Sequence, residues 1–235
     1  MHPFTALMKT ILSTLFIMSI SSLSYSQIYE VGGFLGGSNF IGDVGSTQFI
    51  DPNSYALGGV LKWNRSPRHS FRASLMFSTL SANDNSSDDP KRVNRGYYFD
   101  TSIIEASLGL EFTFFDFNLH SGTPQSSPYI YTGISMANHP NFFFNNNMLI
   151  DEKTKSNAYG IPITLGFKTT VINQIVIAVE LGARYTFSDE IDGSKPDSEE
   201  NQIARFGNFN NNDWYMFSGL IITYTFGRKP CYCDF

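Results

Sequence analysis

The sequence predicts an all-β fold: an eight-stranded antiparallel transmembrane β-barrel of the outer membrane, with short periplasmic turns and long external loops. Three observations predict it. Segments of about ten residues alternate apolar and polar side chains, and after Gln27 no apolar run is long enough for a spanning helix. The connections between the segments are short and long in turn. Aromatic residues gather near the segment ends.

The composition agrees with a membrane barrel. Charged residues make up 16% of the chain and aromatic residues 15%, whereas ordinary soluble domains are roughly 25% charged. The net charge of -5 and the absence of Lys/Arg clusters argue against a nucleic-acid partner. Nothing resembles a linker, so we expect one folded domain.

The chain divides into three parts. Residues 1–26 form a predicted signal peptide, with Lys9, an apolar run over 11–20, and small residues at Ser24 and Ser26 before a cleavage point. The alternative, a membrane anchor, needs an apolar run of ~20 residues. Residues 27–226 form the predicted barrel, and residues 227–235 form a cysteine-containing tail.

The alternation predicts eight strands. They cover residues 28–37, 54–63, 70–79, 102–115, 128–137, 161–168, 177–186 and 214–226. The fourth is the clearest, because Ile104 and Leu108 share one face while Glu105 and Glu111 lie on the other. The fifth is ambiguous in phase, and Pro162 weakens the ladder of the sixth. A soluble sandwich also alternates, so alternation alone does not decide.

The connections and the aromatic residues separate a membrane barrel from a sandwich. The short connections are 64–68, 117–127 and 171–174, and the long ones are 37–53, 83–98, 138–157 and 189–213. An even strand count then leaves both ends of the mature chain in the periplasm. Two aromatic girdles are predicted: Tyr29, Trp63, Phe71, Phe112, Phe114, Tyr129, Tyr224 and Phe226 on the short-turn side, and Tyr55, Phe77, Phe99, Tyr159, Phe187 and Trp214 on the long-loop side. A soluble lipocalin-type barrel is the structural alternative, with its apolar faces inside.

If the apolar faces meet the outer-membrane lipids, the opposite faces fill the lumen. Four acidic and four basic residues are predicted there: Glu30, Lys62, Arg72, Glu105, Glu111, Lys168, Glu180 and Arg184. An eight-stranded barrel is only just wide enough for its own side chains. We therefore expect a charge network that plugs the lumen; a solute path is the alternative.

The sequence offers little catalytic chemistry. It lacks the GxSxG, HExxH and GxxxxGK[ST] motifs, so we expect no enzyme, no cofactor and no metal site. His139 in an external loop could act in a lipid-modifying triad only by a forced arrangement. The acidic loop 189–200 departs from the spacing of an EF-hand. Three consecutive residues, Phe142, Phe143 and Phe144, are predicted to lie in the lipid interface or to contact a partner.

The only two cysteines, Cys231 and Cys233, lie in the tail. Two residues apart, they are poorly placed to bridge each other. In an oxidising periplasm a disulfide to a partner is one interpretation; two unpaired, immaterial thiols are the other. Metal binding needs more ligands than this tail supplies.

The opening QIYEVGGFLGGSNFIGDVG, the length of the barrel and the cysteine-bearing tail resemble the PorG-like outer-membrane proteins of the type IX secretion system. The SYSQ end of the signal fits the Bacteroidota. The resemblance implies a noncatalytic barrel in the cell outer membrane, whose periplasmic side associates with a ring of proteins resembling PorK and PorN. The alternatives are a stand-alone OmpX/OmpA-like barrel that binds an external ligand or adhesion partner, and a lipid-modifying barrel enzyme.

Overall fold

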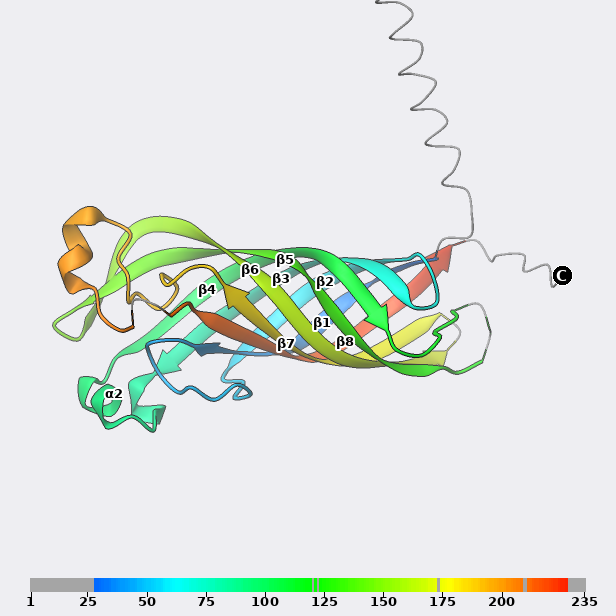
Figure 1. Ribbon diagram of the computed structural model, residues 1–235, viewed down its shortest axis with the longest axis horizontal. Helices are drawn as coiled ribbons and strands as arrows, with labels where there is room; N and C mark the ends of the chain where they lie inside the picture. Colours follow the sequence, from blue (N-terminus) through cyan, green and yellow to red (C-terminus); the bar gives the residue numbers. More distant parts are fainter. Residues whose placement is uncertain (1–27, 120, 122, 173, 209–210, 228–235) are drawn as a thin grey trace, which may run out of the picture.

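The computed structural model describes residues 28–119, 121, 123–172, 174–208 and 211–227. In this part of the chain, eight antiparallel strands form a closed barrel in sequence order, as predicted (Figure 1). Their bounds are β1 Ile28–Ile41, β2 Ser54–Asn64, β3 His69–Asn83, β4 Tyr98–Thr113, β5 Ser126–Asn145, β6 Met148–Ile172, β7 Ile175–Thr186 and β8 Trp214–Gly227. The predicted signal peptide and the tail with Cys231 and Cys233 lie outside the described residues.

The ring closes between the first and last strands. Ile28 of β1 lies opposite Gly227 of β8, and the pairing continues without a break to Ile41 and Trp214. Both described ends of the chain therefore meet the same end of the barrel as the short β2–β3 and β6–β7 turns. This is the periplasmic end, because outer-membrane barrels keep their short turns there.

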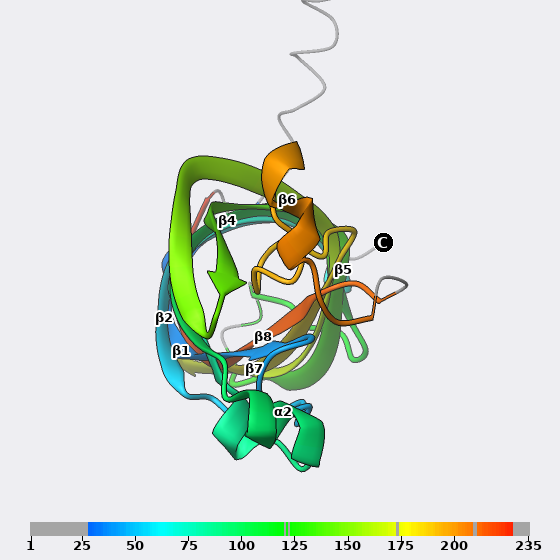
Figure 2. The ribbon, with the colours of Figure 1, turned by 90° about the vertical axis from the view of Figure 1, so that its left-hand side faces the viewer.

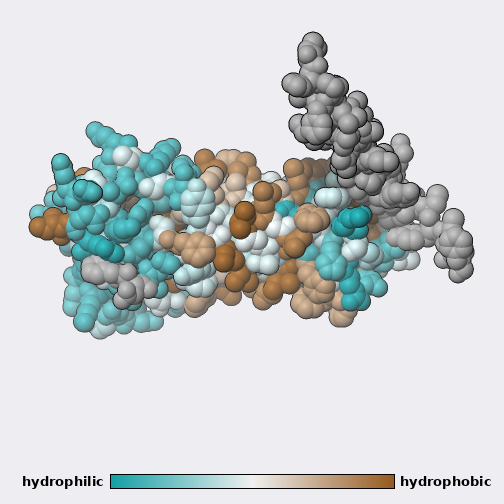
Figure 3. All heavy atoms as spheres, turned by 45° about the horizontal axis from the view of Figure 1, so that its top comes forward, coloured by the Kyte–Doolittle hydropathy of each residue, from teal (hydrophilic) through white to brown (hydrophobic). Residues whose placement is uncertain are grey.

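The outer wall is apolar where a bilayer would touch it. Leu57, Leu108, Leu165 and Leu220 are each about half exposed, and each alternates with a buried neighbour. Figure 3 shows hydrophobic side chains over the middle of the barrel and hydrophilic ones over the external end. No helix in the described residues is long and apolar enough to cross a membrane.

Strands β5 and β6 are much longer than predicted. The segment 138–157 was expected to be a loop, but it forms a hairpin that continues the barrel wall outward (Figure 1). Asn146 and Asn147 make its two-residue turn with φ of 48° and 63°. Asparagine tolerates this left-handed conformation, and such a turn matches the twist of paired strands. The sequence prediction failed because polar residues on both faces hide the alternation.

The structure also settles the phase of β5. Tyr129, Tyr131 and Ser135 face the lumen. The prediction that placed Tyr129 in the short-turn girdle is therefore wrong. Phe99 of β4, predicted in the other girdle, is also fully buried inside the barrel. Pro162 of β6 keeps its pairing with Arg184 of β7, but the pairing with β5 is interrupted between Ile163 and Gly160, as expected where proline has no N–H to donate.

Short helical segments cap the external end (Figure 2). They are η1 Asp84–Ser86 and α2 Pro90–Arg95 between β3 and β4, and η2 Glu199–Ala204 between β7 and β8. The α2 helix begins at Asp89, whose side chain accepts from the Lys91 amide, and ends at Gly96 with φ of 69°. These are ordinary start and stop signals of a helix.

Candidate functional site

A carboxylate surrounded by cations lies in the periplasmic half of the lumen. Lys62 Nζ lies 2.7 Å from Glu111 Oε2, and Lys168 Nζ donates to Glu111 Oε1 at 2.8 Å. Arg72 Nη1 is a further 3.8 Å neighbour of this carboxylate. The four side chains come from β2, β3, β4 and β6 and are all buried. Glu111 thus ties separate parts of the wall together across the interior.

A second ion pair adjoins the first. Arg72 Nη2 donates to Glu180 Oε2 at 3.0 Å, and its Nη1 bonds the other carboxylate oxygen. The Tyr129 hydroxyl donates to the same glutamate. Parallel bonds of a guanidinium to a carboxylate are both strong and directional. The guanidinium also lies 4.6 Å from the ring centroid of Tyr131.

The external half of the lumen repeats this arrangement. Arg184 Nε lies 3.2 Å from Glu105 Oε2, and the Tyr215 hydroxyl donates to the same carboxylate atom at 2.5 Å. Arg184 also lies over the Phe217 ring, 4.5 Å from its centroid. Every one of these side chains is buried.

The last of the eight predicted lumen charges is Glu30 of β1. Its carboxylate accepts from Asn64 Nδ2 at 2.8 Å and from Thr223 Oγ1 at 2.6 Å. The structure therefore brings all eight charged residues into the interior, where ion pairs and hydrogen bonds hold them. Such a lumen is filled with side chains.

Sequence reasoning missed three lumen tyrosines: Tyr129, Tyr131 and Tyr215. Tyr131 donates to Ser107 Oγ at 3.1 Å, which links β5 to β4 inside the lumen. A signal was present, because Ser127 and Ser135 share the parity of Tyr129 and Tyr131 in β5. The recurrence of polar or hydroxyl-bearing residues two or four positions apart in β5 could have identified its inner face.

The three phenylalanines predicted as an external contact lie elsewhere. Phe142, Phe143 and Phe144 are in β5 rather than in a loop, and all are buried. Phe144 stacks on Tyr97 with ring centroids 4.1 Å apart, and Phe142 packs on Phe99. The prediction of an external contact is wrong because these rings pack against other aromatic rings above the lumen. Little of their apolar surface is left for lipid or a partner.

Four aspartates meet beneath the external loops: Asp43, Asp189, Asp192 and Asp213. Asp192 Oδ2 accepts from the Asp43 amide at 2.8 Å, and Asp213 Oδ2 accepts from the Ile191 amide at 3.0 Å. Burial, followed by the nearby charges of Asp192 and Asp43, raises the pKa of Asp189 to about 7. Burial and Asp192 raise the pKa of Asp213 well above its usual value.

This end offers no evident catalytic centre. His139, predicted to be in a loop, lies in β5 and is buried, and its Nε2 has no hydrogen-bond partner in the described residues. Within those residues, no group of three or more His, Cys, Asp or Glu side chains could hold a metal ion. The acidic loop thus holds its carboxylates with backbone amides, which suits a folded cap.

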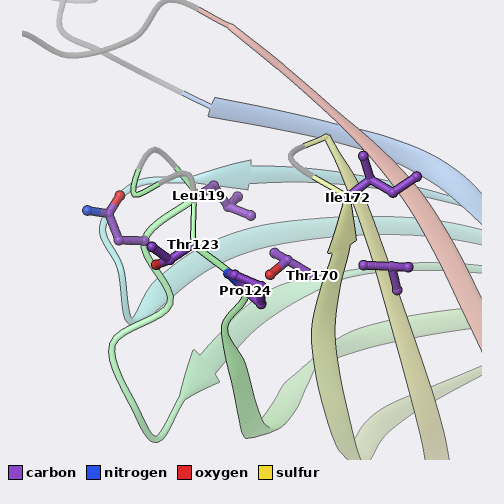
Figure 4. Close-up of a pocket in the computed structure, with 7 residues that line it drawn as sticks. Leu119, Thr123, Pro124, Thr170 and Ile172 are labelled. Carbon is purple, nitrogen blue, oxygen red and sulfur yellow. The ribbon is translucent and has the colours of Figure 1, made fainter.

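The periplasmic rim carries a small hollow of about 30 Å³. Leu119, Thr123 and Pro124 of the β4–β5 connection face Thr170 and Ile172 at the end of β6 across it (Figure 4). Val171 and Ile172 are 56% and 63% exposed. The rim therefore presents apolar side chains at the same end of the barrel as the end of β8, which the cysteine-containing segment follows in the sequence.

A closed ring with an apolar outer wall, a charged and filled lumen, and short turns at one end is the architecture of small outer-membrane barrels. This chain is such a protein, located in the outer membrane. A family model described as a domain of unknown function (DUF6089) matches residues 9–235, and the chain belongs to this family.

Comparison with solved structures found several outer-membrane proteins. Ail of Yersinia pestis, in complex with the heparin analogue sucrose octasulfate, is 11% identical with a TM-score of 0.47, covering 86% of this chain and 99% of that one. A major outer membrane protein from Thermus thermophilus is 12% identical with a TM-score of 0.46, covering 86% and 100%. No curated protein matched the sequence.

Proposed function

We propose that this barrel is a non-enzymatic structural subunit of the type IX protein secretion system. In this role it contacts a periplasmic ring of proteins resembling PorK and PorN through its periplasmic side and its tail. The resemblance of the sequence to PorG-like proteins suggests the system. A lumen filled with buried ion pairs supports an anchoring role over a transport role.

The observation that carries the proposal is the apolar periplasmic rim. Val171 and Ile172 remain largely exposed beside the hollow at Pro124. Exposed apolar groups at the edge of a soluble compartment favour a protein partner. Cys231 and Cys233 follow β8 by a few residues, so a disulfide to the partner would add a covalent link on the same side.

Two sets of variants test the proposal in cells. Val171→Ser with Ile172→Ser should reduce co-purification of the ring proteins and secretion of cargo, while the barrel still reaches the outer membrane. The matched control is Ile203→Ser, because Ile203 is equally apolar, 97% exposed and at the external end. Equal secretion and co-purification in all three proteins would contradict the proposal.

The disulfide has its own test. A non-reducing gel of membranes should show a high-mass adduct that collapses on reduction and vanishes in a Cys231→Ser, Cys233→Ser variant. If only monomer is seen under oxidising conditions and secretion is intact in the variant, the disulfide hypothesis is wrong. The proposed contact through the rim would still stand.

One observation favours the second candidate, a stand-alone barrel with an external ligand. A hollow of about 230 Å³ lies between the first two external loops, lined mainly by amides and hydroxyls such as Asn53, Ser81 and Tyr98. This candidate predicts that deletion of residues 230–235 leaves the function of the protein unchanged, whereas the secretion role predicts a loss.

A further inference from the structure

Small residues interrupt the outer wall of β1 to β4. Gly33 pairs with Gly59, Ala73 lies beside Leu61, and Ala106 lies beside Leu75. All of them face outward, where most neighbouring positions carry leucine, phenylalanine or valine. The apolar wall is therefore hollowed along a diagonal path across four strands.

The hollowing is a continuous groove. One hollow of about 450 Å³ and another of about 430 Å³ share Leu61, Ala73 and Leu108 in their lining. The first reaches Trp63 at the periplasmic girdle, and the second reaches Gly59 near the middle of the wall. Four residues along a strand span about 13 Å. The groove thus runs from the membrane interface toward the bilayer centre.

Close packing does not require glycine in this groove. A Cβ atom added at Gly59 would meet no heavy atom within 4 Å, and one at Gly33 would meet its nearest neighbour at 3.6 Å. At Gly32 and Gly58, by contrast, the added atom would collide with the adjoining strand at 2.0 Å and with a methionine sulfur at 2.2 Å. The open space at Gly59 is therefore a feature of the surface and not a consequence of strand contact.

The periplasmic end of the groove combines aromatic walls and cations. Trp63 stacks on Phe71 with ring centroids 5.2 Å apart. The turn directly beyond them carries Arg65 and Arg68, both exposed. Arg68 pairs with Asp116 at 2.5 Å, whereas Arg65 makes no ion pair within the described residues. An unpaired guanidinium at this level is placed to meet a phosphate.

We infer that this groove binds one phospholipid of the periplasmic leaflet, with an acyl chain along Gly59 and Ala73 and the phosphate at Arg65. The groove lies on the lipid-facing wall, is apolar along its length, and ends at a cation at the interface, which matches the order of groups in a phospholipid. A flat wall would offer neither the groove nor the charge at its end.

Native mass spectrometry of the purified full chain tests this inference. The protein is incubated with dioleoyl phosphatidylethanolamine or with dioleoylglycerol, which has the same chains but no phosphate. The wild type should retain one phospholipid and prefer it to the diacylglycerol. Gly59→Leu with Ala73→Leu should weaken retention about tenfold, the effect of displacing roughly two methylenes. Ala183→Leu repeats one of these substitutions outside the groove, on β7, and should retain lipid as the wild type does.

Arg65→Gln provides a second variant that leaves the barrel wall intact. It should abolish the preference for phospholipid over diacylglycerol while both still bind. Three results would overturn the inference: no retained phospholipid in the wild type, equal loss in Ala183→Leu, or a wild-type dimer that the groove variants convert to monomer. The last result would assign the groove to a second copy of the chain.

Discussion

Arg72 of β3 and Glu180 of β7 form a two-pronged ion pair inside the barrel, although 108 residues separate them in the sequence. The pair joins strands that are not neighbours in the ring. Both charges are shielded from water, so each charge needs the other to offset the cost of its burial. The tyrosine hydroxyl of Tyr129 completes the coordination of the carboxylate.

Glu180→Gln should therefore destabilise the barrel. Removal of one partner of a buried pair costs about 3–5 kcal/mol, because the other charge stays buried. Urea unfolding in lipid vesicles, followed by heat-shifted gel mobility, measures the change. The control is Asp116→Asn, which breaks the exposed pair with Arg68 and should cost about 0–1 kcal/mol. Equal losses in the two variants would show that burial does not set the strength of the lumen pair.

The filled lumen also predicts the electrical behaviour of the protein. Planar bilayers that contain the folded barrel should show no stepwise ion conductance, because Glu111 and its three cations occupy the interior. A double variant, Tyr129→Ala with Tyr131→Ala, removes two large buried rings and should admit water and produce measurable current. Regular conductance steps in the wild type would contradict a plugged lumen.

The external cap should depend on pH. The pKa of Asp189 is about 7 in the folded protein and near 3.8 when unfolded. Because the folded value is the higher one, its protonation stabilises the cap at low pH, and this stabilisation is lost as pH rises through 7. Hydrogen exchange of the loop 188–213, corrected for intrinsic rates, should therefore show more opening at pH 8.5 than at pH 5.5.

Asp189→Asn should reduce that difference, because the side chain then stays neutral beside Asp192 and Asp43. Arg205 and Lys195 face the same carboxylate and lower its pKa. Both residues are kept in the variant, so that only the charge of residue 189 changes. Asp88→Asn, outside this cluster, is the matched control. An unchanged pH response in Asp189→Asn would assign the opening to another group.

The aromatic cluster at the external end predicts a local effect. Phe144→Ala removes the stack on Tyr97 and the edge contact with Phe206. The hairpin 138–157 should then be cut faster by protease, while the heat-shifted mobility of the barrel stays the same. Leu149→Ala is the control, because Leu149 pairs with Phe144 across the hairpin but is exposed. Equal protease sensitivity in both variants would show that the aromatic cluster does not hold the hairpin.

The sequence alone could predict the barrel, its eight strands and the inward face of six of them. Alternation is a local property with a period of two, so it survives without any knowledge of neighbours. The eight charged lumen residues followed from the same period, as Glu105 and Glu111 of β4 illustrate. The phase of β5 did not follow, since Tyr129 and Tyr131 on the inner face alternate with Pro128, Ile130 and Ile134 on the outer face, and neither face carries a charge.

Only the tertiary structure decided which of these side chains contact one another. The sequence placed Arg72, Lys62 and Glu180 in one lumen, but the stagger of the closed ring determines that Arg72 reaches Glu180 and Lys62 reaches Glu111. The same closure gathers Phe144 of β5 with Tyr97 and Phe206 of two external connections, which no local pattern relates. Local periodicity determined the faces of the strands, and the register between distant strands determined the contacts.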